Sequence, residues 1–375
     1  MKLHRNVDRH NISCALFFIP LSCMFLLSYL TYWNLTSNTE ILGYDTYIQF
    51  FSIWRSLKPL FLVMVLIKVY FLSEYSKKQL VLISVYLLAT YWICKNYHPN
   101  YYLLYAVSFC FSAKGIKYKI IAKAYLLYSV CTLLITFVAL WYGIINDNIV
   151  MRGIYQRHSF GLVHPNSFGM WSLMIIIFYI QYKYDSIKPF HFIALLAQAL
   201  AVYCYTNSRA SFALSIMSIS LSFLVTCIRE NQNKYKYLMK VLAIAILSIV
   251  IIWFIICYRY GFHSSLSLLI DKMCSGRVHW SNQAINDYPP TLFGNNVTFS
   301  YPVDPLFTYT LVIYGYVGLA MFLSMFYVGA LRTYRKRLPF ILIAFLSFQM
   351  YNTQENVFLY HLFDLTMFTA TCDLD

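Results

Sequence analysis

The chain has 375 residues, of which 60% are hydrophobic and only 11% are charged, and its mean hydropathy is +0.59. A soluble domain carries about 25% charged residues, so this composition excludes an ordinary soluble protein and predicts an integral membrane protein. The formal net charge of +15 would suit nucleic-acid binding, but the distribution of the basic residues along the chain argues against such a partner.

Polar breaks divide the chain into about twelve apolar segments, several of which reach the roughly twenty residues that a helix needs to cross a bilayer. The first segment follows a basic N-terminus and lacks a small-residue cleavage site, so we expect a retained span and not a removed signal peptide. The predicted spans are 12–33, 48–72, 80–94, 99–113, 124–145, 165–182, 189–205, 210–228, 238–258, 305–331, 338–352 and 356–371. We therefore predict an all-α, polytopic protein that forms a single transmembrane domain over residues 1–375. Spans near fifteen residues are short for a full crossing, and we expect some of them to be tilted, broken or re-entrant.

The basic residues orient these spans. Alternate loops, counted from the N-terminus, hold 19 of the 29 basic residues, whereas the intervening loops hold seven. By the positive-inside rule the first set is cytoplasmic, which places both termini in the cytoplasm. The charge is thus a topology signal and an attraction to anionic membrane lipids, and no nucleic-acid partner is predicted. Two long loops, 146–164 and the larger 259–304, then lie on the outer face, where we expect the functional site.

The few cations on the outer face are mostly arginines. Thirteen of the 19 cytoplasmic cations are Lys, whereas five of the seven outer ones are Arg152, Arg157, Arg209, Arg259 and Arg277. A guanidinium binds phosphate oxygens in a bidentate geometry, and the positive-inside rule disfavours cations on this face. Their retention predicts an anionic ligand there, with chance as the alternative in so small a sample.

The first outer motif runs from Arg157 and His158 to His164-Pro165-Asn166, at the start of a predicted span. Pro165 suits the first turn of a helix, so the alternative is that Pro165 and Asn166 only shape the helix start. That alternative does not account for Arg157 and His158.

Two further motifs place an arginine on the outer face. Arg209 lies in a very short turn between two predicted spans, where it binds either a phosphate or, in the alternative, lipid headgroups. In the large loop, Gly276 precedes Arg277, and His279 and Trp280 follow closely. A glycine beside an arginine lets backbone and guanidinium approach a phosphate together, and an indole ring can stack on a sugar.

The last motif begins with Asp304-Pro305, where the large loop meets the membrane, and continues with Gly315 and Gly318 in the next span. Partial burial there would raise the pKa of Asp304 and suit it to general-base catalysis. The alternative, which the local sequence alone favours, is an N-terminal helix cap.

The sequence contains no glycine-rich nucleotide loop, no HExxH motif and no His/Cys spacing typical of metal sites, and none of its ten cysteines forms a CxxC pair. We therefore predict neither a metal nor a cofactor.

In their order along the chain, these motifs resemble the Wzy-type O-antigen, capsule and exopolysaccharide repeat-unit polymerases of the O-antigen ligase/polymerase superfamily. The similarity is specific over about 160–320, from the stretch ending in His164-Pro165-Asn166, through Asn207-Ser208-Arg209 and Ser275-Gly276-Arg277 with Trp280, to Gly294 and then Asp304, Gly315 and Gly318. Where the ligases of the superfamily carry a histidine, this chain has Asp304, which looks more like a polymerase.

The resemblance implies a GT-C-like fold and a metal-free, inverting glycosyltransferase in the bacterial cytoplasmic (inner) membrane. Its substrate would be an undecaprenyl-diphosphate-linked oligosaccharide on the outer face, and a flippase and a chain-length regulator of the same pathway would be its partners. In this chain the diphosphate would be bound by Arg157, Arg209 and Arg277, and the proton would be accepted by Asp304 or His158. Sugars would contact His164, Asn166, His279 and Trp280. A polysaccharide ligase and a non-enzymatic flippase remain the alternatives.

Overall fold

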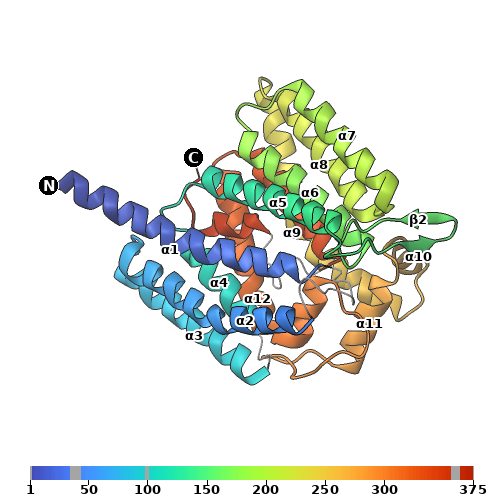
Figure 1. Cartoon of the computed structure of the whole chain (residues 1–375), viewed down its shortest axis with the longest axis horizontal. Helices are drawn as coiled ribbons and strands as arrows, with labels where there is room; N and C mark the ends of the chain where they lie inside the picture. Colours follow the sequence, from blue (N-terminus) through green and yellow to red (C-terminus); the bar gives the residue numbers. More distant parts are fainter. Residues whose placement is uncertain (1, 34–43, 98–100, 356–363, 375) are drawn as a thin grey trace. The chain divides into compact units, whose positions relative to one another are not determined.

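The computed structural model describes residues 2–33, 44–97, 101–355 and 364–374, whose regular structure is helical apart from one short β-hairpin (Figure 1). Within these residues, six helices are long and apolar enough to cross a membrane: 9–30 of α1, α5, α7, α8, α9 and α12. The prediction of an all-α membrane protein is confirmed at this level, whereas the count of twelve spans and the GT-C-like architecture remain predictions.

The chain forms two compact units, each built from two stretches of sequence. Unit 1 comprises residues up to 72 and 116–227, and unit 2 comprises 73–115 and 228–374. Unit 1 contains α1 (Lys2–Leu30), α2 (Tyr44–Ile67), a π-helical turn (Lys68–Leu72), α5 (Tyr118–Trp141), strands β1 (Val150–Arg152) and β2 (Tyr155–Arg157), α6 (Pro165–Lys183), α7 (Pro189–Thr206) and α8 (Arg209–Ile228).

Buried aromatic rings hold α1, α5 and α6 together in unit 1. Trp171 is fully buried and meets Tyr29 edge-to-face, with ring centroids 4.5 Å apart, and Phe25 at 5.5 Å. Tyr125 links Phe25 to Phe178 in the same way. Such edge-to-face pairs add to the free energy gained by burial, so they fix the positions of these helices and of the loops at their ends.

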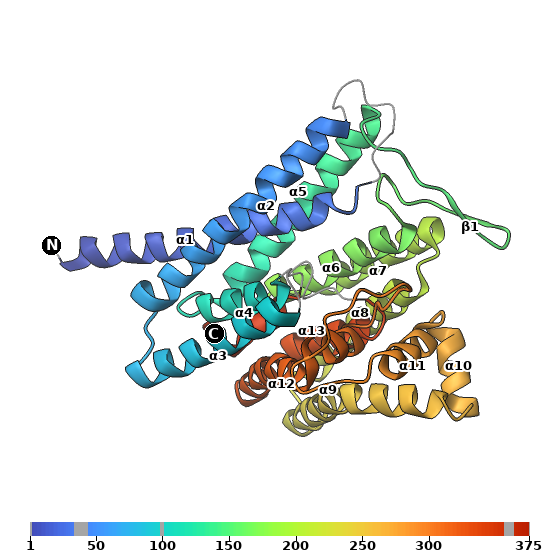
Figure 2. The same ribbon diagram turned by 90° about the horizontal axis from the view of Figure 1, so that it is seen from below.

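The β1–β2 hairpin occupies the predicted outer loop 146–164. Its strands pair in antiparallel register, with Val150 opposite Arg157 and Arg152 opposite Tyr155. The tip projects away from the helices of its unit (Figure 2), whereas the base is tied to the end of α7 because the His158 backbone N–H donates to the Tyr205 carbonyl. The hairpin therefore carries Arg152 and Arg157 to the α7–α8 turn.

Unit 2 is built around α12 (Leu306–Arg335), which contacts α3, α9, α11 and α13. The other elements of unit 2 are α3 (Lys77–Tyr97), α4 (Tyr102–Ser112), α9 (Gln232–Tyr260), α10 (Ser265–Met273), α11 (Arg277–Asp287), α13 (Pro339–Asn352) and a 3-10 helix (Leu365–Ala370). The large loop 259–304 thus contains two short helices. Of the predicted span 356–371, residues 356–363 lie outside the described residues, and the remainder is the 3-10 helix and the start of a turn.

Within α12 the backbone breaks at Gly315, which has φ 70° and ψ −172°. The break frees the N–H groups of Tyr316 and Val317, and these donate to the carbonyls of Thr291 and Leu292, at 3.1 and 3.0 Å. The freed Val312 carbonyl accepts from the backbone and side-chain nitrogens of Asn295. Unpaired backbone groups are costly in a membrane, so the segment 291–295 stabilises the broken helix.

Candidate functional site

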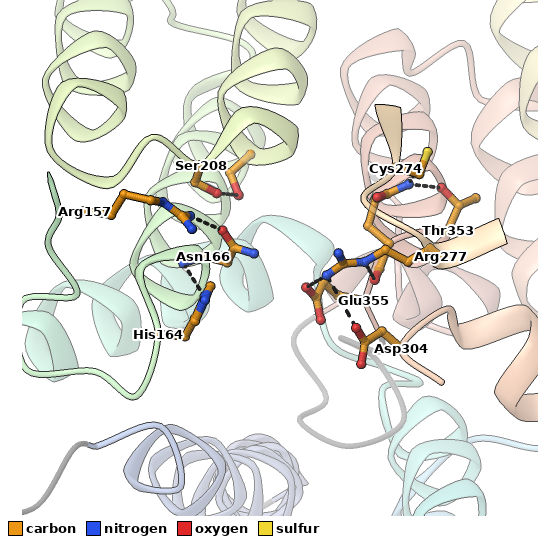
Figure 3. A network of polar contacts seen from close by, with 11 residues as sticks. Arg157, His164, Asn166, Ser208, Cys274, Arg277, Asp304, Thr353 and Glu355 are labelled. Carbon is orange, nitrogen blue, oxygen red and sulfur yellow. Dashed lines mark hydrogen bonds and ion pairs between the residues drawn. The ribbon is translucent and has the colours of Figure 1, made fainter. Parts of the chain in front are cut away.

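In unit 1, Arg157 is held by neutral partners on two helices (Figure 3). Its Nε donates to the Thr206 carbonyl at the end of α7, at 2.7 Å, and its Nη2 donates to Oδ1 of Asn166 in the first turn of α6, at 2.6 Å. Arg152, the last residue of β1, donates from Nη1 to the Asn207 carbonyl at 3.2 Å. Two of the five N–H donors of Arg157 are therefore used, and none of the acceptors is charged.

Arg157 is 2% exposed, yet in the described part of the chain no ion pair joins it, Arg152 or Arg209 to a carboxylate. Burial, with the positive charges of Arg152 and Arg209, lowers the pKa of Arg157 to about 10. We call Arg152, Arg157 and Arg209 the arginine cluster. A buried cation without a counter-charge is strongly unfavourable, so the cluster has the electrostatics of a site for an anion.

Two helix N-termini add to the positive potential of the cluster. Arg209 is the first residue of α8 and is exposed, and Asn166 is the second residue of α6. Backbone N–H groups at such ends carry partial positive charge and favour anions. His164 caps α6, because its Nδ1 accepts from the Asn166 N–H at 3.1 Å, while the side chain of Asn166 accepts from Arg157. This geometry fits the alternative that Asn166 shapes the helix start, and it shows that His164 takes part as the N-cap. The sugar contacts predicted for His164 and Asn166 remain a prediction.

His158 lies beside the cluster but engages a different partner. Its Nδ1 is 2.6 Å from Oδ2 of Asp147, whose Oδ1 accepts from the N–H groups of Ser159 and Phe160. Burial raises the pKa of Asp147, but the hydrogen bonds from His158 and these N–H groups outweigh it and leave the pKa below its usual value. Asp147 therefore orients the imidazole and also stabilises the loop that follows β2.

In unit 2, Arg277 at the start of α11 lies between two carboxyl groups (Figure 3). Its Nη2 is 3.0 Å from Oε1 of Glu355 and 3.4 Å from Oδ2 of Asp304, and its Nε donates to the Gln354 carbonyl at 3.3 Å. Asp304 does not cap α12, whose N-cap is Pro305 with no side-chain hydrogen bond. We call Asp304 and Glu355 the carboxylate pair.

The carboxylate pair has perturbed acidity. Burial, with the negative charge of Asp304, raises the pKa of Glu355 to about 7, against the opposing effect of Arg277. Burial also raises the pKa of Asp304, and Arg277 again opposes the shift. Two carboxyl groups that share one cation do not both ionise readily, so the pair can hold or release a proton near neutral pH.

Aromatic residues from two parts of the large loop stack on each other, one part following Arg277 directly in the sequence. Trp280 stacks on Tyr301, with ring centroids 5.3 Å apart and planes inclined by 21°, and His279 lies against Trp280 at 4.8 Å. One face of the Trp280 ring is thus already covered by Tyr301. The predicted sugar contacts of Trp280 and His279 remain a prediction, and Tyr301 belongs to the same surface.

The predicted residues form one group in each unit, and each group contains residues that the sequence motifs did not single out as site residues. Arg152 belongs to the same group as Arg157 and Arg209. Glu355 belongs with Arg277 and Asp304, and Asp147 with His158. Among the described residues, no three His, Cys, Asp or Glu side chains lie close enough to hold a metal ion.

No protein-family model matches the chain, and no curated protein or solved structure is similar to it. The resemblance to repeat-unit polymerases therefore rests on the sequence motifs alone.

Proposed function

We propose that the chain is a membrane glycosyltransferase that polymerises oligosaccharide repeat units carried on a lipid diphosphate. The substrate, undecaprenyl-diphosphate-linked oligosaccharide, and the outer face of the bacterial cytoplasmic membrane follow from the family resemblance. What carries the proposal in the structure is Arg157, a guanidinium that is 2% exposed, lacks a carboxylate partner in the described residues, and has Arg152 and Arg209 nearby. A diphosphate is the kind of ligand that would compensate three such charges.

In the proposed reaction, a sugar hydroxyl of one lipid-linked unit attacks the anomeric carbon of another. The new O–C bond forms as the bond from that carbon to the diphosphate breaks, and the lipid diphosphate leaves with the bonding electron pair. The arginine cluster stabilises the charge that develops on the leaving group, which is a large contribution in a preorganised site. The hydroxyl proton passes to a basic side chain, for which each unit offers one candidate: the carboxylate pair in unit 2 and His158 in unit 1.

We propose for Arg277 a role different from the one implied by the resemblance. Because it is already paired with Asp304 and Glu355, its charge is compensated, and we propose that it positions the carboxylate pair and keeps one member ionised. His158 is the second candidate for the proton acceptor, since the Asp147 carboxylate contacts Nδ1 and orients the ring.

The test is polymer length on a gel, in a strain that lacks this gene and is complemented with single variants. We expect the deletion to leave only single repeat units, and Arg209→Gln and Arg157→Gln to restore little long polymer at wild-type protein levels. Loss of one such contact lowers the reaction rate by about 100-fold or more, because the transition state is less stabilised. Arg209→Gln is the cleaner variant, because Arg157 also holds Thr206 and Asn166 in place.

Arg259→Gln is the matched control, since Arg259 is an exposed arginine of the predicted outer face that lies outside the cluster. It should restore polymer of normal length. Long polymer that stays on its lipid carrier and never reaches its final acceptor would show a ligase instead. Repeat units that accumulate on the cytoplasmic side would show a flippase.

A further inference from the structure

A cavity of about 550 Å³ lies within unit 2, and its volume is typical of small-molecule sites. Neither Arg277 nor the carboxylate pair is among its lining residues. Its wall is formed by α3, α12, the end of α4 with the turn after it, and the end of the 3-10 helix. Nothing in the proposed reaction uses this cavity.

The two parts of the wall differ in chemistry. Apolar side chains, including Leu82, Met325 and Val328, make up most of it, and Leu82 and Val328 are 67% and 48% exposed. The polar part contains Lys114 and Arg332, and none of the described lining residues is acidic. An apolar chain and an anionic head would therefore both find a matching surface.

Arg332 is the charged group that the wall holds in a fixed position. It is half-buried and donates from Nη1 to the Thr369 carbonyl at 2.6 Å and from Nη2 to the Cys372 carbonyl at 3.0 Å. These acceptors are neutral, so they orient the guanidinium without compensating its charge, and other N–H donors remain for a ligand.

The hydroxyl groups of the wall are already engaged with the protein. Tyr75 donates to the Phe111 carbonyl at 2.7 Å, Thr371 donates to the Cys110 carbonyl, and Tyr86 donates to the Met321 carbonyl. A polar headgroup in the cavity would therefore meet chiefly cations. The basic segments 77–78, 113–117 and 332–337 contain lining residues of the cavity or directly adjoin them in the sequence. The charge pattern predicts these segments to be cytoplasmic, on the side of anionic lipids.

We propose that this cavity binds an anionic phospholipid of the cytoplasmic leaflet. The phosphate binds at Arg332 with Lys114 nearby, and an acyl chain lies along α3 and α12 against Leu82, Met325 and Val328. Charge selects the ligand, because a zwitterionic phospholipid offers the same chains but its cationic headgroup would meet Arg332 and Lys114.

The test uses the full chain purified in detergent, with native mass spectrometry to measure binding of dioleoyl phosphatidylglycerol and of dioleoyl phosphatidylcholine. We expect phosphatidylglycerol to bind more tightly, and Arg332→Gln to weaken it at least about fivefold. The matched control is Arg335→Gln, one turn further along α12 and outside the cavity, which should change binding less than twofold. Equal affinity for the two lipids, or equal losses in the two variants, would overturn the proposal.

A second variant tests the apolar part without touching the charge. Val328→Trp fills the cavity from an exposed position and should also weaken phosphatidylglycerol at least about fivefold, whereas Val241→Trp on α9, which is 43% exposed, should not. A Val328→Trp protein that binds the lipid normally, or full competition by millimolar inorganic phosphate, would show that no acyl chain occupies the cavity. Thermal unfolding without added lipid checks that each variant is folded.

Discussion

At the scale of single residues, the acidity of Glu355 is the property that catalysis would use. Burial and the charge of Asp304 raise its pKa to about 7, so Glu355 would be half ionised near neutral pH. Below that pH it becomes protonated and can no longer accept a proton. We expect the rate of chain elongation in isolated membranes to fall as pH decreases below about 7.

Two substitutions next to Glu355 should move this fall in the elongation rate, the acidic limb of the pH–rate profile, in opposite directions. Asp304→Asn removes the negative charge that raises the pKa of Glu355, so the limb should shift to lower pH. Arg277→Gln removes the cation that lowers this pKa, so the limb should shift to higher pH. The measurement is the initial elongation rate against pH for each variant.

Glu355→Gln should abolish elongation at every pH. If Asp304→Asn is inactive instead and Glu355→Gln retains a normal profile, Asp304 is the proton acceptor. If only His158→Gln abolishes elongation, and both carboxylate variants keep the wild-type pH profile, the proton acceptor is His158, oriented by Asp147.

The sequence singles out only part of each group of residues, for a physical reason. Arg277 and Asp304 lie in motifs of one loop, but Glu355 reaches Arg277 from 78 residues away and follows a helix whose sequence is simply apolar. Asp147 precedes His158 by eleven residues in an irregular turn, where no periodicity predicts contact. Tertiary packing alone brings these carboxylates to their partners.

At the scale of elements, Gly294 and Gly315 allow the segment 291–295 and the broken helix α12 to approach each other closely. A Cβ on Gly294 would lie 2.0 Å from the Ile313 carbonyl oxygen, and one on Gly315 would lie 2.3 Å from the Gly294 nitrogen. Both glycines also have positive φ, at 100° and 70°. Their place in the sequence motif is thus explained by the broken helix and the segment that repairs it, without any contact to substrate.

Gly294→Ala should destabilise the protein by about 2 kcal/mol or more, because it combines an unfavourable φ with a steric clash against backbone. Gly115→Ala in the same unit is the matched control: its φ is 78°, but nothing lies within 4 Å of the added Cβ. We expect it to cost about 1 kcal/mol. Thermal unfolding in detergent compares them, and equal losses would mean that the close approach at Gly294 contributes nothing.

Helix positions follow the sequence closely where apolar length and proline define them. The spans predicted at 165–182, 189–205 and 210–228 are observed as Pro165–Lys183, Pro189–Thr206 and Arg209–Ile228. Prolines begin α6 and α7 because their fixed φ suits the first turn. By contrast, the short helices α10 and α11 inside the large loop carry too few apolar residues to resemble spans, and the predicted last span ends in a 3-10 helix.

At the scale of the whole molecule, α6 decides the topology. It has 19 residues, most of them buried against its neighbours, and it is not among the six helices that qualify as spans by length and hydropathy. The predicted orientation nevertheless requires α6 to cross, since only an odd number of crossings separates the hairpin at 150–157 from the basic loop after α8. A helix shielded from lipid by protein can cross with less apolar character than a lipid-facing one.

We therefore expect epitope tags inserted at Gly153, Asn231 and His263, all exposed, to report alternating sides. Tags at Gly153 and His263 should bind antibody on spheroplasts, and a tag at Asn231 only after permeabilisation, because α6 to α8 make three crossings and α9 makes one. If Gly153 and Asn231 report the same side, α6 does not cross, and the arginine cluster and the large loop then lie on opposite faces. If all three tags are inverted, the cluster faces the cytoplasm, and polymerisation on the outer face is excluded.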